Sequence, residues 1–140
     1  MSDITLEQAQ KAIEGALKQA RELGYLMSVG LVDAGANMKA FFRMDGAWLG
    51  SIDFAMKKAK AARLFDRPSG ELMELAQPGG PLYSIQHSND GLITIPGGVP
   101  IKNADGTIIG AIGVAGGNAG MPHEVSRIVA EAGAAAVLAD

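Results

Sequence analysis

The sequence of 140 residues contains no cysteine, which excludes disulfides, thiolate zinc sites and cysteine nucleophiles. Histidine occurs only at His87 and His123, and these two are not spaced as ligands of one metal, so we expect no metal site. The apolar runs are too short to span a membrane, and the net charge of −3 provides no basic surface for nucleic acid. We therefore expect neither a membrane nor a nucleic acid as partner.

The first ten residues, MSDITLEQAQ, contain early acids and no apolar core followed by a cleavage site. This pattern argues against a signal peptide, and we expect a cytoplasmic protein. The length suits a single domain that spans residues 1–140 and can bury a core. The sequence contains neither an internal repeat nor a linker.

Glycine, in contrast, is abundant, and it is concentrated in residues 91–117. The β-branched residues of this stretch and a turn at residues 103–106 indicate two or three packed strands at the centre of a sheet. Glycine weakens a strand, so its repetition predicts close approach of a packed helix or of a ligand above a pocket floor. The G-x-x-G-x-x-G spacing of Gly110, Gly113 and Gly116 argues against a nucleotide-binding loop.

The rest of the chain indicates helices around a β-hairpin. A capping box of Thr5 and Gln8 marks the start of the first helix, and Gly24 marks its end. In chain order, we expect a helix over residues 6–23, strands over 26–32 and 38–44, helices over about 48–65 and 71–76, and a last helix from Pro122. This order predicts the α+β class with a mostly antiparallel sheet.

The helix expected over residues 48–65 has two apolar faces. Phe54, Ala61 and Phe65 lie nearly opposite to the first face. The first face consists of Ile52, Ala55, Met56, Ala59 and Ala62. One face can pack on the sheet, and the other needs later helices or a second subunit. Lys58 projects between Phe54 and Phe65, where its ammonium either reaches water over its apolar stem or meets an anionic ligand.

Several motifs together resemble a known family. They are Asp45-Gly46, AMKKAKAA at residues 55–62, QPGGPLY at 77–83, PGGVP at 96–100 and GAIGVAGG at 110–117. Together they cover the chain from about Thr5 to Leu138, and they resemble the GlcG/HbpS-like haem-binding proteins, a family that also occurs as a domain of some cobalamin adenosyltransferases. The resemblance implies a profilin-like, five-stranded antiparallel sheet flanked by helices, and homo-oligomers such as octamers. For some members it also implies binding of haem or related tetrapyrroles, and occasionally haem degradation or redox sensing.

The sequence departs from the family pattern after the last glycine motif. Ala115 stands where family members commonly have serine, and Ser126 stands where an aspartate opens the last helix. The loop between them is about two residues longer and ends in His123 and Glu124. These differences indicate that the chemistry of the site has changed.

Two functions follow from these residues. The first is binding of haem or a similar flat, acidic ligand, with Lys58 and Arg63 paired to its carboxylates. The complete set of candidate ligand-binding residues is Asp45, Lys58, Arg63, Tyr83, His87, Gly97, Gly98, Gly116 and Gly117. The candidate iron ligands are His87, His123, Tyr83, Met44 and Met121, none of them fixed by a spacing motif.

The second function is a small-molecule enzyme without an organic cofactor. Lys58 would bind a carboxylate, and His123 and Glu124 would transfer protons, although adjacent helical residues point about 100° apart. Backbone amides around Gly97, Gly98 and Gly116 would stabilise a developing anion. A non-catalytic scaffold remains a third alternative, in which only apolar residues would line the pocket.

Overall fold

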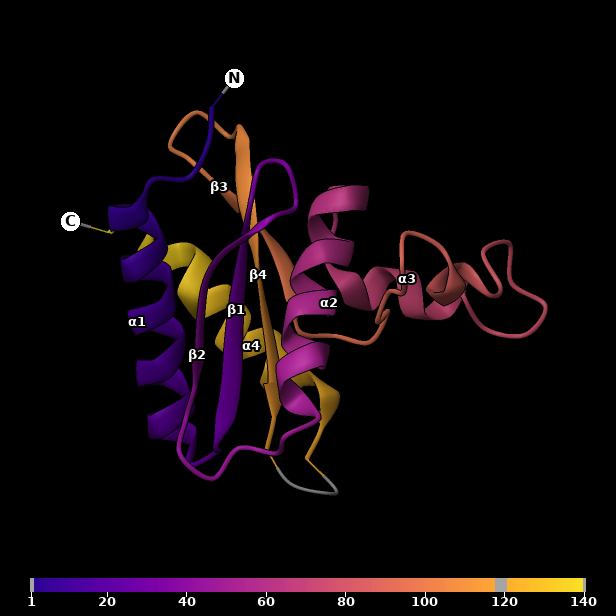
Figure 1. Cartoon of the computed structure of the whole chain (residues 1–140), viewed down its shortest axis with the longest axis horizontal. Coiled ribbons are helices and arrows are strands. Elements are labelled where there is room, and N and C mark those ends of the chain that lie inside the picture. The colour runs from indigo at the N-terminus through magenta and orange to yellow at the C-terminus, as the bar shows by residue number, and fades with distance from the viewer. Residues whose placement is uncertain (1, 118–120, 140) are drawn as a thin grey trace.

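The computed structural model describes residues 2–117 and 121–139. Over this part of the chain, helices lie on both faces of one antiparallel sheet with the strand order β2-β1-β4-β3 (Figure 1). The elements are α1 (Leu6–Leu23), β1 (Met27–Asp33), β2 (Met38–Arg43), α2 (Ser51–Phe65), α3 (Ser69–Leu75), the 3-10 helix η1 (Ile85–His87), β3 (Gly98–Lys102), β4 (Ile108–Gly116) and α4 (His123–Ala136). The predicted α+β class is confirmed.

The expected number of five strands is wrong, because the described residues form four. Residues 92–95, which belong to the glycine-rich stretch, have no regular structure. Pro96 follows them and has no N–H to donate to a strand pair. The Ser69 hydroxyl donates to the Ile95 carbonyl at 2.7 Å and accepts from the Gly98 N–H at 2.8 Å. This segment is therefore bonded to the start of α3 instead of extending the sheet.

The predicted caps of α1 and the predicted turn between β1 and β2 are present in the structure. The Thr5 hydroxyl accepts from the Gln8 N–H at 3.1 Å, and the Gln8 side chain accepts from the Thr5 N–H at 2.9 Å. Gly24 ends α1 with a left-handed φ of 79°. In the hairpin between β1 and β2, the Asp33 carboxylate accepts from the N–H groups of Gly35 and Asn37, each at 2.9 Å. These bonds close the predicted turns locally.

The sheet separates two packed layers. On one face, Val29 and Leu31 of β1 and Ile112 and Val114 of β4 join the core formed with α1 and α4. On the other face, Val32 and Ala111 pack with Ala59 and Ala62 of α2. Figure 1 shows α2 on the opposite side of the sheet from α1 and α4. The end of β4 and the beginnings of α2 and α4 consequently lie near one another at one end of the molecule.

Two glycines of the sheet permit the close approach of α2. A Cβ atom at Gly113 would overlap the Ala55 carbonyl oxygen, and one at Gly98 would overlap the Lys58 carbonyl oxygen. Both atoms belong to the helix backbone, which cannot move aside without moving α2. The sequence left open whether a packed helix or a ligand approaches these glycines, and at these two positions the structure shows a helix.

The second apolar face of α2 is covered in part by later residues of the same chain. Ala61 is buried with Leu72 of α3 and Leu92, and Phe65 packs against this cluster. Phe54 remains 43% exposed. The α3 and η1 segment that supplies the cover extends sideways from the body of the molecule (Figure 1). Within the described ranges, none of the helices is long and apolar enough to cross a membrane.

Candidate functional site

A pocket of about 260 Å³ opens between the first half of α2, the end of β4 and the start of α4. Its walls are mainly apolar and include two aromatic side chains, and four polar side chains interrupt them. The apolar residues are Trp48, Phe54, Ile95, Ala115 and Met121, the polar ones are Ser51, Lys58, His123 and Ser126, and Gly50 and Gly116 complete the lining. An apolar cleft with a few convergent polar groups is typical of a small-ligand site.

Lys58 is the charged group that is buried in this pocket. The residue is 3% exposed, and its Nζ donates to the Val114 carbonyl oxygen at 3.0 Å. Among the described residues no carboxylate forms an ion pair with it. Burial lowers the pKa of the Lys58 amine from 10.5 to about 8, because the charged form loses solvation there. The amine is therefore short of the anionic partner that a buried ammonium requires.

The residues around Gly97 shape the space that Lys58 occupies. Gly97 has a φ of 133°, and a Cβ atom there would lie 2.5 Å from the Val114 carbonyl oxygen and 3.0 Å from Lys58 Nζ. Any side chain at this position would push into the lysine. The Val114 N–H also donates to the Gly97 carbonyl at 2.8 Å, which fixes this segment beside β4. Gly97 therefore positions the lysine and does not itself line the pocket.

Hydroxyl groups line other parts of the pocket. The Ser51 hydroxyl donates to the Trp48 carbonyl at 2.5 Å and lies 2.7 Å from the Ser28 hydroxyl. Because the single Ser51 proton is used toward Trp48, Ser28 is the donor in the second bond. This chain of bonds ties the beginning of α2 and the Trp48 loop to β1. Ser126, which is 3% exposed, lines the pocket from α4.

The structure brings Lys58 and His123 to one pocket but places Glu124 elsewhere. His123 begins α4, is exposed and lines the pocket wall. Glu124 lines a different surface depression together with Arg67 and Arg127. The two residues expected to act together as acid and base therefore line two different depressions.

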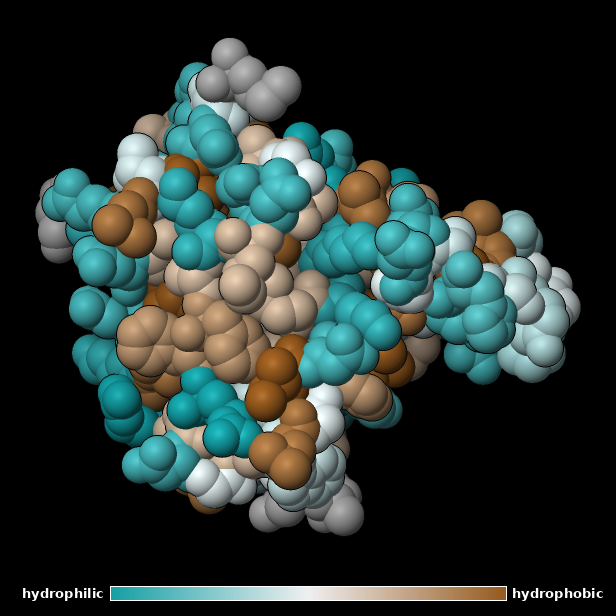
Figure 2. All heavy atoms as spheres, viewed as in Figure 1, coloured by the Kyte–Doolittle hydropathy of each residue, from teal (hydrophilic) through white to brown (hydrophobic). Residues whose placement is uncertain are grey.

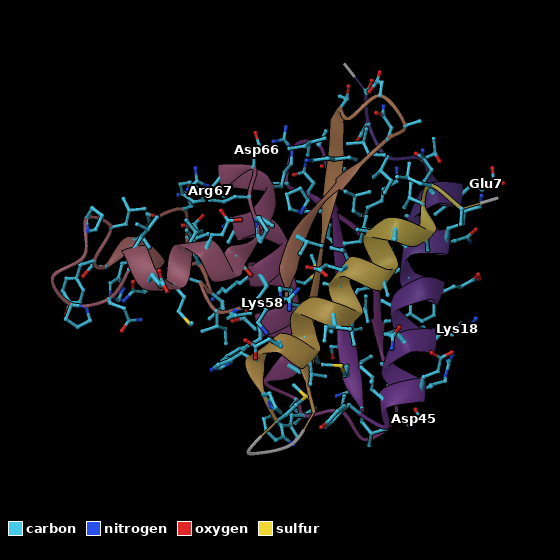
Figure 3. The ribbon with its side chains drawn as sticks, turned by 180° about the vertical axis from the view of Figure 1, so that it is seen from behind. Glu7, Lys18, Asp45, Lys58, Asp66 and Arg67 are labelled. Carbon is cyan, nitrogen blue, oxygen red and sulfur yellow. The ribbon has the colours of Figure 1, made fainter. Side chains whose placement is uncertain are left out.

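The remaining sequence candidates are distributed over the molecule. Asp45 lines a separate depression with Arg21 and Arg43, and Figure 3 shows it at the end of the molecule near α1, away from Lys58. Arg63 forms an ion pair with Asp66 near the end of α2.

The other four candidates also lie outside the pocket lining. Tyr83 is 59% exposed and His87 is exposed, both in the projecting segment. The backbone of α2 packs directly against Gly98, and a Cβ atom at Gly117 would overlap the Met121 sulfur. Of the altered loop, residues 118–120 lie outside the described part of the chain.

Sequence reasoning missed several residues of the pocket wall, among them Trp48, Ser51 and Ile95. The sequence placed Phe54 on the apolar face that needed later helices or a second subunit, whereas the structure shows that this side chain lines the same pocket as Lys58. One signal was available, since Ser51, Phe54 and Lys58 follow the i, i+3, i+7 spacing of one helix face. Ile95 carries no such signal, because it lies in an irregular segment.

Residues 4–135 match the family described as haem-degrading, HbpS-like proteins, which confirms the resemblance of the motifs. An uncharacterised 15.0 kDa protein of Citrobacter freundii, from the dhaT–dhaS intergenic region, is 34% identical over 132 residues, covering 94% of this chain and 89% of that protein. The solved structure of the Klebsiella pneumoniae protein ORFY superposes with a TM-score of 0.90 at 30% identity, over 98% of this chain and 92% of that chain. A PduOC complex with haem superposes with a TM-score of 0.85 at 29% identity, over 96% of this chain and 94% of that chain. The chain belongs to the HbpS-like family.

Proposed function

We propose that the protein binds haem, or a similar flat and acidic molecule, in the pocket beside Lys58. The observation that carries the proposal is a buried ammonium without a carboxylate partner, among the described residues, at an apolar, aromatic-walled cavity. A ligand carboxylate supplies the missing charge, and the ligand's flat apolar body packs against Trp48 and Phe54. Membership of the HbpS-like family and similarity to the haem complex of PduOC support this choice of ligand.

The residues of the pocket are compatible with haem. His123 offers an imidazole and Met121 a thioether, both side-chain types that hold haem iron in proteins. The pocket of about 260 Å³ is slightly smaller than the roughly 300–1,000 Å³ typical of small-molecule sites. A single chain would therefore enclose only part of a haem macrocycle. When bound, haem would supply iron redox chemistry, while Lys58 and the aromatic walls hold and orient it.

The position of Glu124 favours binding over acid–base catalysis by the adjacent pair. His123 lines the proposed ligand pocket, and Glu124 lies in another depression with two arginines. An acid and a base can act on one substrate only where both side chains reach it. The binding function needs only the groups that meet in the pocket.

A haemin titration followed by the Soret absorbance tests this function. We expect saturable binding by the wild-type protein, with affinity reduced about tenfold or more in Lys58→Met because a charge-assisted contact is lost. His123→Ala should shift the Soret band or weaken binding if the imidazole faces the iron. His87→Ala is the matched control, because His87 lies in the projecting segment, and this variant should bind haemin as the wild type does. Non-saturating binding by the wild type would reject the proposed function.

A further inference from the structure

The Lys58 side chain contributes to the pocket wall, and almost all of its surface is shielded from water. The residue is 3% exposed and contributes to the same wall as Trp48 and Phe54. Among the described residues its Nζ has one hydrogen-bond acceptor, the Val114 carbonyl. A neutral amine keeps two N–H groups, so it can retain this bond after it loses a proton, and its lone pair is then free. Geometry therefore permits the nitrogen to act as a nucleophile.

Among the described residues, no carboxylate forms an ion pair that would stabilise the protonated amine. On α2 the neighbouring Asp53 pairs with Lys57 at 2.9 Å, and Lys60 donates to the Asn89 carbonyl. Ala115 and Gly116 of β4 line the pocket and carry no charge. Besides Lys58, the titratable side chain that lines the pocket is His123 of α4.

With no carboxylate beside it among the described residues, the buried amine has a pKa lowered to about 8. At neutral pH its uncharged fraction is on the order of 10²-fold that of an ordinary lysine.

We propose that Lys58 forms a reversible covalent imine with small aldehydes that carry an apolar or aromatic body. A lysine that is desolvated in an apolar pocket is the form of this side chain that reacts with carbonyl compounds. The walls suit such a molecule, because Trp48 and Phe54 can contact an aromatic ring. This activity goes beyond haem binding and does not depend on it.

The reaction balances without an oxidant or a reductant. The Nζ lone pair attacks the carbonyl carbon, an N–C bond forms, and the electrons of the C=O π bond move to oxygen. Transfer of one proton from nitrogen to this oxygen gives a carbinolamine. Loss of the hydroxyl group together with the second nitrogen proton releases one water and leaves the imine. His123 is the titratable side chain on the wall that can accept and return these protons.

Labelling with benzaldehyde in the presence of cyanoborohydride tests the proposal, because the reductant converts the imine into a stable secondary amine. The full chain is treated at pH 7, and the labelled lysines are identified by peptide mass spectrometry. We expect Lys58 to be modified at least tenfold faster than Lys57, its more exposed neighbour on α2. The label at Lys58 should persist in Lys57→Arg, and it should disappear in Lys58→Met without redistribution to other sites.

An unlabelled Lys58, or one labelled no faster than Lys57, would overturn the proposal. This comparison is made within the wild-type protein, so it stays decisive even if Lys58→Met does not fold. Haemin binding is measured on the same preparation. If the protein binds haemin but Lys58 does not react, only the proposal of imine formation is rejected. If Lys58 reacts but the protein does not bind haemin, only the proposal of haem binding is rejected.

Discussion

Burial of the Lys58 amine costs the folded protein stability at neutral pH. The pKa of this amine is 10.5 in an exposed chain and about 8 in the folded protein. Between these two pH values the unfolded state binds more protons, so the free energy of unfolding rises with pH across this window. Below pH 8 the whole cost is present, and it amounts to about 3 kcal/mol for this difference in pKa. This cost supports the proposal that Lys58 serves ligand binding.

Replacing Lys58 with methionine should therefore stabilise the protein at pH 7. Methionine fills a similar volume and needs no solvation, so we expect a gain of about 1–3 kcal/mol in urea unfolding. The gain should shrink as the pH rises from 8 toward 10.5, where the wild-type amine becomes neutral anyway. Lys57→Met is the control. Because Lys57 is partly exposed, the stability of this variant should change with pH as that of the wild type does. If the unfolding free energies of the wild type and Lys58→Met changed with pH in parallel, burial would not shift the pKa of this amine.

The packing of α2 on the sheet determines where Lys58 lies. Gly98 and Gly113 leave room for the helix backbone, and Gly97 leaves room for the lysine side chain. The sequence predicted the close approach, because glycine weakens a strand and recurs within one mainly where another part of the structure or a ligand comes near. It could not distinguish a helix from a ligand as the occupant, since that depends on which face of the strand α2 covers.

Valine at Gly113 should separate α2 from β4. Its Cβ atom would overlap the Ala55 carbonyl oxygen and lie 2.5 Å from the Ala59 nitrogen, so the helix must move. We expect a loss of at least about 3 kcal/mol in thermal or urea unfolding, at the upper end for overpacking.

Gly50→Ala is the matched control for this substitution. A Cβ atom at Gly50 meets no other atom within 4 Å, and this change should cost less than about 1 kcal/mol. Equal stability of the two variants would contradict the packing argument.

The helices, the hairpin and the strand pair at residues 98–116 could be predicted because their signals are local. The capping box of Thr5 and the turn at Asp33 are formed by residues close in sequence. The prediction of a fifth strand was wrong because residues 92–95 are held elsewhere. The Ile95 carbonyl accepts a hydrogen bond from Ser69, which lies 26 positions earlier in the chain. The pocket was predicted only in part for the same reason, since β4, α2 and α4 meet there through tertiary packing.

Exposed apolar side chains lie on β2 and around the beginning of α2. They include Met38, Phe42, Trp48, Leu49 and Ile52, each at least 39% exposed. Figure 2 shows apolar side chains gathered over β2 and beside α2. An apolar surface of this kind commonly marks a contact with another protein, and a second copy of the chain is the partner that we propose.

Sedimentation should therefore detect a homo-oligomer, and Leu49→Asp should shift it toward smaller species. Leu49 is 76% exposed and does not line the pocket, so the charge should act on assembly without touching the ligand site. Leu6→Asp serves as the control, because Leu6 is 61% exposed at the start of α1, where an acidic side chain is favourable. A wild-type monomer at micromolar concentration would contradict this assembly.

A crystal structure of the protein with haemin most directly tests the claim that Lys58 and the pocket between α2 and α4 hold the ligand. We predict that one edge of the macrocycle lies against Trp48 and Phe54. A carboxylate oxygen should then lie about 2.7–2.9 Å from Lys58 Nζ. Haemin bound at Tyr83 and His87 on the projecting segment, with no ligand atom near Lys58, would contradict the account.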